Sequence, residues 1–254
     1  MYVPPYESQG KACLGQGGKG AESVTKSRLP RLDTNSLDQV VSTLTKPRLS
    51  KYLKASKNNC QQALRLYVLN TSVSAAFLAD LHYVEVALRN KFDRELAALY
   101  GREWFKDAGF LSLVDPYTQG LFEKARKAAK KGLPKGTPTP PGKVVAELTF
   151  GLWAGLTDPK LEHSLWVPCL HKAFAPRKAP KRSTFNQQLE KLRQLRNRVA
   201  HHEPIFHLDL LGTHKLLREV AALLCPMTAS VMTSTSSVRR EVMALTRYCQ
   251  KRDI

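Results

Sequence analysis

The feature that most constrains the fold is a long run of residues whose apolar side chains recur at helical spacing. Across residues 72–100, the apolar positions step by three, four or seven, which places them on one face of an α-helix. These positions are Val73, Phe77, Leu81, Val84, Leu88, Phe92 and Leu99. Gly101 is a typical residue to end such a helix, and Asn70 or Thr71 is expected to cap its start. The run predicts one long, buried helix.

Further segments carry the same helical signal, and no segment has the period-two alternation flanked by hairpin turns that indicates a strand. Helices are expected at residues 61–69, 122–131, 143–153, 161–174, 184–202, 209–225 and 237–250. Trp104, Trp153 and Trp166 are expected in the core or at helix junctions rather than as platforms for base stacking. We therefore expect an all-α fold, an irregular helical bundle.

Composition supports a folded chain with a flexible start. Of the 254 residues, 43% are hydrophobic and 24% are charged, which is typical of a globular protein. Residues 1–36 are rich in Gly, Ser and Pro and predict a flexible basic leader. Residues 37–225 are expected to form the main helical domain, and residues 226–254 a polar linker followed by a helix.

Five cysteines without a CxxC pair argue against a disulfide framework and favour a reducing compartment. No segment approaches the roughly 18 uninterrupted apolar residues of a spanning helix, and the start of the chain lacks the apolar region of a signal peptide. We therefore expect a cytoplasmic protein that makes no membrane contact.

The charge of the chain is strongly positive and unevenly distributed. Forty Lys and Arg against 21 Asp and Glu leave a formal charge of +19. Residues 1–58 carry +6, residues 59–120 carry −1, residues 121–200 carry +12 and residues 201–254 carry +2. A surplus spread evenly would be explained by solubility alone, whereas this concentration favours a nucleic acid as partner.

Two basic insertions, residues 122–143 and 172–183, supply most of the central charge. Their Pro and Gly residues and their Lys and Arg side chains suit contacts with phosphates, which position a nucleic acid without reading its bases. The residues expected to bind RNA are Lys124, Arg126, Lys127, Lys130, Lys131, Arg177, Lys178, Lys181, Arg182 and Arg198.

The segment LRNRVAHHEP at residues 195–204 gathers polar and basic side chains at a predicted helix end. Asn197 and His201 lie one turn apart, whereas Arg196 and His201 project about 140° apart on an ideal helix. Near the end of the helix, its dipole favours a protonated imidazole. A histidine can transfer the protons of RNA phosphodiester cleavage, and a guanidinium can stabilise the negative charge that develops. We expect His201 to be the general acid and base, Arg196 the phosphate ligand and Asn197 an orienting group.

The same segment also has a purely structural interpretation, in which His201 only caps carbonyl groups and Arg196 only pairs with a carboxylate. Neighbouring histidines such as His201 and His202 cannot both face one metal ion from a regular helix, and no cysteine lies at zinc spacing. We therefore expect neither a metal nor another cofactor.

Here the chain resembles a known family. Arg196, Asn197 and His201 match the RNxxxH signature of HEPN-domain proteins, and HEPIF at residues 202–206 is similar to the block that follows it in the Abi-like abortive-infection branch. LADLHYVEVALRN at residues 78–90 resembles a conserved helix of that branch, as do the later Tyr100-Gly101, Trp104 and LTFG at residues 148–151 before Trp153. The resemblance covers roughly residues 45–225, with its blocks in matching order.

The resemblance implies a HEPN-like helical domain that works as a homodimer, with two RNxxxH motifs facing each other. It implies an antiphage toxin that cleaves RNA without a metal, and for some Abi-like proteins a small structured RNA that restrains them. Glu85, Arg89, Asn90 and His202 are expected to support the site. Glu85 and Arg89 are spaced as an i,i+4 ion pair, which also suits a buried pair that only sets how two helices meet.

Two other functions stay open at this point. A non-catalytic protein that forms a ribonucleoprotein with a structured small RNA would have the same charge distribution. A nucleotide transferase is a third interpretation, although no glycine-rich loop in a suitable context supports it.

Overall fold

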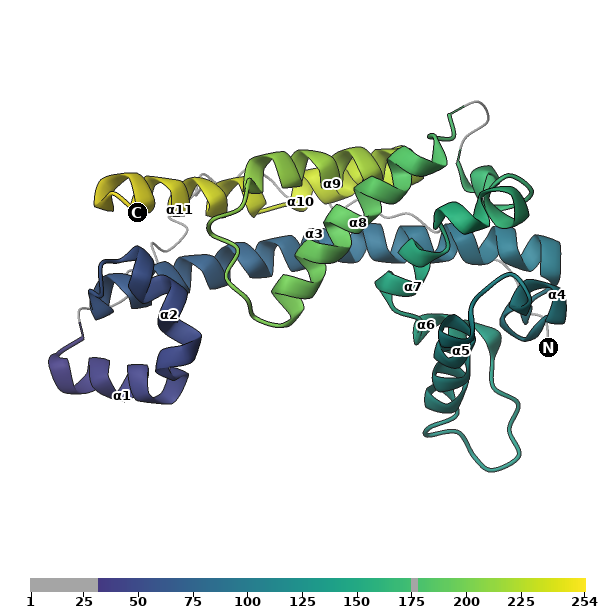
Figure 1. Ribbon diagram of the computed structural model, residues 1–254, viewed down its shortest axis with the longest axis horizontal. Helices are drawn as coiled ribbons and strands as arrows, with labels where there is room; N and C mark the ends of the chain where they lie inside the picture. Colours follow the sequence, from purple (N-terminus) through teal and green to yellow (C-terminus); the bar gives the residue numbers. More distant parts are fainter. Residues whose placement is uncertain (1–31, 175–177) are drawn as a thin grey trace, which may run out of the picture.

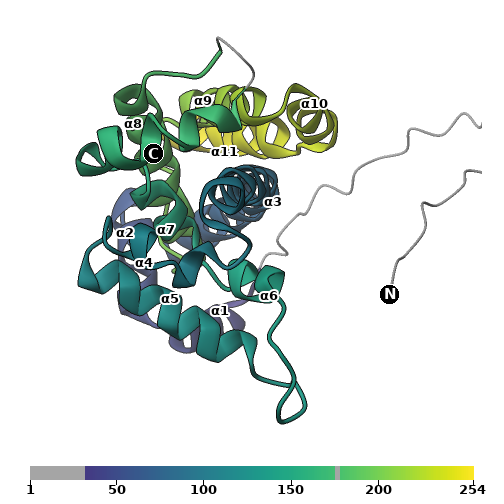
Figure 2. The same ribbon diagram turned by 90° about the vertical axis from the view of Figure 1, so that its right-hand side faces the viewer.

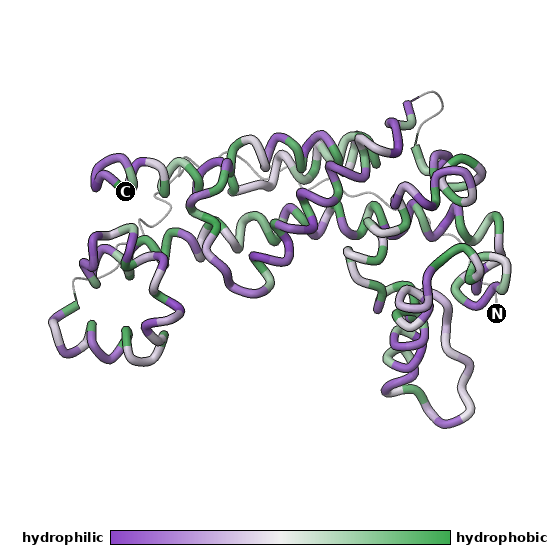
Figure 3. Tube along the Cα trace, viewed as in Figure 1, coloured by the Kyte–Doolittle hydropathy of each residue, from purple (hydrophilic) through white to green (hydrophobic). Residues whose placement is uncertain are grey.

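The computed structural model describes residues 32–174 and 178–254, and within these ranges the elements are helical, with no strand. The predicted all-α class is confirmed. Helix α3 (Cys60–Tyr100) runs along most of the molecule, and most of the other helices pack against it (Figure 1). Along the trace, hydrophilic and hydrophobic residues alternate within the helices, as expected when each helix buries one face (Figure 3).

Helix α3 is one continuous helix, so the predicted break between residues 61–69 and 72–100 is wrong. Its N-cap is Asn59, whose side chain accepts a hydrogen bond from the Gln62 N–H. Asn70 does not cap a helix but turns its side chain to another part of the chain, and Thr71 donates its hydroxyl to the Tyr67 carbonyl. The polar residues are therefore satisfied without interrupting the helix. The expected end at Gly101 is confirmed, with φ of 85°.

Helices from both ends of the sequence flank α3. They are α1 (Thr34–Leu44), α2 (Lys46–Ala55), α9 (Leu210–Leu224), α10 (Pro226–Thr235) and α11 (Val238–Arg252). Helix α9 confirms the prediction for residues 209–225, with Asp209 as its N-cap. The polar linker expected after residue 225 is instead helix α10, because Pro226 favours a helix start and Ala229 and Met232 bury one face. Helix α1 begins at Thr34, inside the predicted leader, and residues 1–31 lie outside the described ranges.

A cluster of aromatic rings fixes the far end of α3. The elements there are η1 (Trp104–Lys106), α4 (Ala108–Leu111), α5 (Pro116–Ala129), α6 (Pro141–Ala146) and α7 (Phe150–Gly155). The ring centroid of Trp104 lies 5.0 Å from that of Phe110, 5.5 Å from that of Phe122 and 5.9 Å from that of Trp153. Trp166 is also buried, so the expected core role of the three tryptophans is confirmed. The cluster anchors α5 and α7 beside α3.

Two predicted helices are broken into shorter pieces. Residues 143–153 are split between α6 and α7, because Thr149 is extended and redirects the chain. Residues 161–174 do not form an α-helix, because Pro168 has no N–H with which to continue one. They fold instead as η3 (Glu162–Trp166) and η4 (Leu170–Ala173), after η2 (Pro159–Leu161).

Helix α8 (Arg182–Ala200) crosses α3 obliquely and also contacts α7 and α9 (Figures 1 and 2). It was predicted over residues 184–202 and ends two residues earlier. Its buried face consists of Arg182, Phe185, Leu189, Leu192, Leu195 and Val199. Arg193, Arg196 and Asn197 are spaced three and four residues apart and share another face of the helix, the face on which the site is built.

Candidate functional site

A cavity of about 780 Å³ lies between α5, α7, η2 and α8, and Arg196 and Asn197 are among the residues that line it. The buried face of α8 packs against α3 and α7, so the next face of α8 is directed to the cavity. The other walls come from residues before and within α5, from α7 and from η2: Leu113, Val114, Asp115, Tyr117, Thr118, Leu121, Thr149, Gly151, Leu152, Gly155, Leu156, Asp158, Lys160 and Leu161. Two of the three predicted catalytic residues thus line the same half-open cavity.

Arg196 is held by an ion pair to the long helix. Its Nε lies 3.7 Å from Glu85 Oε2, and both side chains are partly exposed. The expected pair between Glu85 and Arg89 is not seen in the described residues, where Arg89 instead donates to its neighbour Asn90 at 3.3 Å. Glu85 therefore contacts the RNxxxH residues, whereas no hydrogen bond or ion pair in the described residues joins Arg89 or Asn90 to them.

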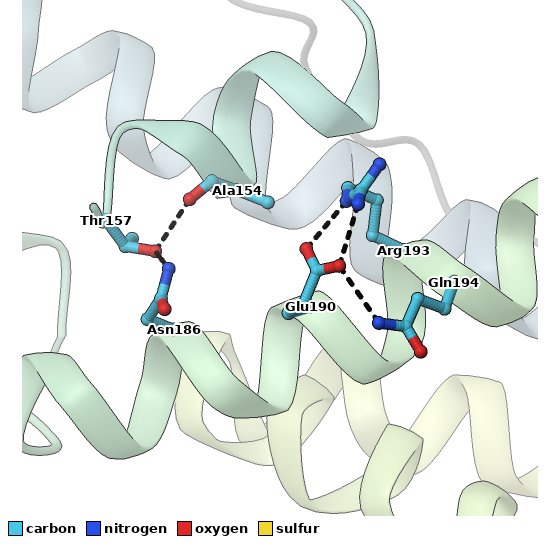
Figure 4. A network of polar contacts seen from close by, with 6 residues as sticks. All are labelled: Ala154, Thr157, Asn186, Glu190, Arg193 and Gln194. Atoms are coloured by element: carbon cyan, nitrogen blue, oxygen red, sulfur yellow. Dashed lines mark hydrogen bonds and ion pairs between the residues drawn. The ribbon is translucent and has the colours of Figure 1, made fainter. Parts of the chain in front are cut away.

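Arg193 is a lining residue that the sequence interpretation missed. It makes two hydrogen bonds of 2.7 Å to the Glu190 carboxylate, and Gln194 donates to the same carboxylate at 3.1 Å (Figure 4). These bonds hold the pKa of Glu190 below its usual value and raise the pKa of Arg193. The spacing of Glu190 and Arg193, three residues apart on a predicted helix, was the available signal.

His201 is the C-cap of α8 and lies just outside the helix. The predicted helix over residues 184–202 would have included it in the last turn. His202 follows in the left-handed region with φ of 56°, which is unusual for a residue other than glycine. The His202 N–H bonds to the Val199 carbonyl at 3.1 Å, and the Glu203 N–H bonds to the Arg198 carbonyl at 2.8 Å. This pattern is a Schellman motif with histidine in the glycine position. Both histidine side chains are exposed, and His201 does not line the cavity.

Two residues that the sequence interpretation did not assign to the site hold the chain after α8 in place. Arg48 of α2 donates to the carbonyl groups of His201 and His202, at 3.4 and 3.0 Å. Buried Asn70 accepts the N–H groups of Ile205 and Phe206, at 2.7 and 3.0 Å. The signal for Asn70 was an amide inside an apolar helical run, whereas no local pattern marks Arg48.

Most of the predicted RNA-binding residues are placed on the surface. Those with exposed side chains are Lys124, Lys127, Lys130, Lys131, Lys178 and Lys181. Arg126 pairs with Glu123 on the same helix, and Arg198 lies 3.6 Å from Glu203. Arg177 lies outside the described residues. The exposed lysines of α5 follow directly on its cavity-lining residues, so cavity and basic helix are continuous.

Arg182 is the exception, because its side chain is buried. Its Nε bonds to Glu162 at 3.0 Å and its Nη1 bonds to the Thr157 carbonyl at 2.8 Å. Asn186 donates to the hydroxyl of Thr157, which in turn donates to Ala154 (Figure 4). The guanidinium joins the start of α8 to the segment after α7 and is unavailable to a phosphate. The expectation that Arg182 contacts RNA is therefore corrected.

A second polar cluster joins Asp80 of α3, His214 of α9 and Ser236, which precedes α11. Ser236 donates to Asp80 Oδ2 at 2.6 Å, and His214 Nε2 lies 3.3 Å from the same oxygen and 3.4 Å from the hydroxyl. One imidazole nitrogen faces both partners and the serine proton goes to the carboxylate, so this is not the relay of a nucleophilic triad. Burial raises the pKa of Asp80 and lowers the pKa of His214.

Within the described ranges, no group of three or more His, Cys, Asp or Glu side chains is arranged to hold a metal ion. None of the described helices is both long enough and apolar enough to cross a membrane.

Comparison with known proteins identifies one family. The family model described as Abi-like protein matches residues 36–207, a range that includes most of α1, all of α2 through α8, the cavity and residues 196–201. No curated protein and no solved structure matches the chain.

Proposed function

The chain belongs to the Abi-like protein family, and from this premise we propose that it is an abortive-infection protein of the HEPN type that cleaves RNA without a metal ion. Abortive infection is a form of defence against phage, and the family membership supports that role. The finer proposal, endoribonuclease activity, rests on the residues of the site.

The proposed reaction is an internal transphosphorylation of RNA. The 2′-hydroxyl loses its proton and its oxygen attacks the adjacent phosphorus, while the bond from phosphorus to the 5′-oxygen breaks and that oxygen takes up a proton. The products are a 2′,3′-cyclic phosphate and a 5′-hydroxyl, so no water is consumed. His201 transfers the protons, Arg196 neutralises the charge on the phosphorane, and Asn197 orients the phosphate.

One observation carries the proposal: Arg196 and Asn197 open side by side into a cavity that also presents the cations Arg193 and Lys160. A phosphodiester at this edge of the cavity would meet a guanidinium that is already oriented by Glu85. Orientation before binding lowers the cost of ordering the side chain in the transition state.

The proposal includes a homodimer. His201 is exposed at the C-cap of α8 and does not line the cavity of its own chain. A two-fold axis near the end of α8 would bring the exposed histidine of one chain toward the arginine and asparagine of its partner. His201 of one chain would then share a cleft with Arg196 and Asn197 of the other chain.

The test is the chemistry of the RNA ends. Purified protein is incubated with labelled RNA in EDTA, and the products are analysed for 2′,3′-cyclic phosphate. We expect these ends with the wild type and their loss with His201→Ala and Arg196→Ala, while His163→Ala, at an exposed histidine of η3, cleaves normally. Equal cleavage by His201→Ala and wild type would refute the nuclease proposal.

The alternative is a non-catalytic protein that holds a structured small RNA. It is favoured by the surface lysines of α5, whose contacts would supply affinity without chemistry. Tight binding of RNA that stays intact over the whole incubation would support this alternative.

A further inference from the structure

An exposed aromatic ring stands at the edge of the cavity that holds Arg196 and Asn197. Tyr117 lies in the first turn of α5 and lines the cavity, and 75% of its surface is exposed. No other aromatic ring of the described residues stacks on it, whereas Trp104, Trp153 and Trp166 are buried. An aromatic ring without a stacking partner, presented to a cavity, is the arrangement on which a nucleobase stacks.

The inner walls of the cavity suit a flat, largely apolar group. Leu121, Leu152 and Leu156 are among the lining residues. Gly151 and Gly155 also line the cavity, and because they have no side chain they leave space beside α7. A Cβ at Gly155 would meet no atom within 4 Å, which confirms that the space in front of it is open. The volume of about 780 Å³ lies within the range of pockets that take small organic ligands.

Charged side chains of both signs line the cavity. Lys160, Arg193 and Arg196 bring three positive charges, and Asp115 and Asp158 bring two negative ones. Each carboxylate caps a helix, since Asp115 accepts the Thr118 N–H at 2.7 Å and Asp158 accepts the Lys160 N–H at 2.9 Å. A bare polyphosphate would be repelled by the carboxylates, whereas a nucleotide can offer its base to the apolar wall and its phosphate to Arg196.

We propose that this cavity binds one unpaired nucleotide of the RNA, with the base stacked on Tyr117 and the adjoining phosphate at Arg196 and Asn197. The inference rests on the proposed function and adds the substrate class to it. A base in a duplex is stacked and paired and cannot enter the cavity, so the substrate is single-stranded RNA or an unpaired loop.

The direction of the strand beyond the pocket follows from helix α5. Lys124 lies seven residues after Tyr117 and three after Leu121, so the three side chains lie on one face of the helix. The strand that leaves the cavity along this face meets the exposed amine of Lys124, and the exposed Lys130 and Lys131 follow at the end of the helix. The aromatic ring and the basic residues thus form one continuous track.

The test is an equilibrium binding measurement that does not depend on cleavage. The probe is a fluorescent, single-stranded RNA of about ten nucleotides whose 2′-hydroxyls are methylated, so that it cannot be cut. We expect Tyr117→Ala to weaken binding about 5- to 150-fold, the range given by the loss of one stacked base. Tyr117→Phe keeps the ring and is expected to bind within about threefold of the wild type. The same strand annealed to its complement is expected to compete at least about tenfold less well.

A second pair of variants tests the cavity itself. Gly155→Leu places a side chain in the open space and is expected to weaken binding by about tenfold or more. Gly142→Leu is the matched control, because Gly142 also lies in a short helix with nothing within 4 Å of its Cβ but does not line the cavity. Circular dichroism establishes that each variant is folded.

The outcomes separate the pocket from the nuclease. Wild-type affinity in both Tyr117→Ala and Gly155→Leu, or no binding of the probe by the wild type, overturns the pocket even if RNA is cleaved. Weakened binding in both variants supports the pocket even if the wild type cuts no RNA, in which case only the nuclease proposal falls.

Discussion

The Arg196 guanidinium lies 3.7 Å from the Glu85 carboxylate and so joins the RNxxxH residues of α8 to the long helix α3. Both side chains are partly exposed, and a pair of this kind contributes at most about 1 kcal/mol to stability. Its effect is on orientation. The side chain of Arg196 is long and would otherwise rotate freely on α8. The ion pair with Glu85 restricts this rotation at the point where Arg196 lines the cavity.

Glu85→Gln is expected to affect the rate of cleavage more than the fold. Without the carboxylate, Arg196 is no longer held, and we expect the single-turnover cleavage rate to fall about tenfold. Removal of a negative charge should leave RNA affinity equal or slightly higher. Glu203→Gln is the control, since Glu203 pairs with Arg198 at 3.6 Å near the same helix end but lies away from the cavity. Equal rates for Glu85→Gln and wild type would show that the pair does not position Arg196.

Asn70→Ala is expected to lower the free energy of unfolding by about 2–4 kcal/mol. The substitution leaves the N–H groups of Ile205 and Phe206 without a partner in a buried place. Asn90→Ala, on the exposed side of the same helix, should change it by less than about 0.5 kcal/mol. Urea denaturation measures both. A small effect at Asn70 would mean that water replaces its amide.

His202→Gly is expected to stabilise the protein by about 1 kcal/mol, because glycine adopts a φ of 56° without the clash that a Cβ makes. His201→Gly should give no such gain, since His201 has φ of −92°. Denaturation midpoints of the two variants and the wild type decide the point. A loss of stability in His202→Gly would show that its imidazole makes a contact worth more than the backbone strain.

Stability is expected to fall as the pH drops below about 6.5, and His214 is one cause. Burial lowers the pKa of His214, helped by Arg218 and opposed by Asp80. The unfolded imidazole therefore takes up a proton before the folded one, so protonation favours the unfolded state. Burial also raises the pKa of Asp80, whose contribution has the opposite sign and appears at lower pH.

His214→Asn should flatten the pH dependence of unfolding below about pH 7, a window that begins near the ordinary histidine pKa and extends to lower pH because the pKa of the folded imidazole is lowered. His82→Asn, at an exposed histidine of α3, is the control and should leave the slope unchanged. An unaltered slope in His214→Asn would assign the dependence to other groups, of which His207 also has a pKa lowered by burial.

Lys124, Lys127 and Lys130 are expected to set the salt dependence of RNA binding. Replacing all three by Ala should make the log–log slope of affinity against salt shallower by about 2, at about 0.7 for each lost phosphate contact on a single strand. Lys215→Ala, on the exposed side of α9, should not change the slope. If the triple variant has the wild-type slope, these lysines do not contact RNA.

Much of the fold was predictable because helical periodicity is local. The stripe from Val73 to Phe92 and the signal at Gly101 correctly predicted the second part of α3 and its end, and the apolar pattern of residues 209–225 predicted α9. The errors arose where polar side chains have two possible partners. The local sequence predicts Asn70 as a helix cap, whereas its side chain accepts a hydrogen bond from the N–H of Ile205, 135 residues later in the chain. Pro168 and Thr149 break helices whose apolar patterns look continuous.

The candidate site was predictable in part. Arg196, Asn197 and His201 stand out in the sequence as a cluster of polar residues at a helix end. The grouping of Arg196 and Asn197 with Glu85, Arg193 and Tyr117 depends on the packing of α8 against α3 and on the position of α5 across the cavity, which no local pattern encodes. Arg182 was misassigned because charge alone does not reveal whether a guanidinium meets solvent or is itself buried beside a carboxylate.

The amino-acid sequence by itself determined the helical class, the site of the long helix, the surplus of charge in residues 121–200 and the RNxxxH residues. Periodicity, helix caps and charge depend on residues that are close together in the chain, so they can be predicted from the amino-acid sequence alone. Only the tertiary structure decided that Glu85 holds Arg196, that Asn70 and Arg48 hold the chain after α8, and that Tyr117 faces the same cavity as Asn197. Such contacts join residues far apart in the chain, and they exist only once the helices have packed.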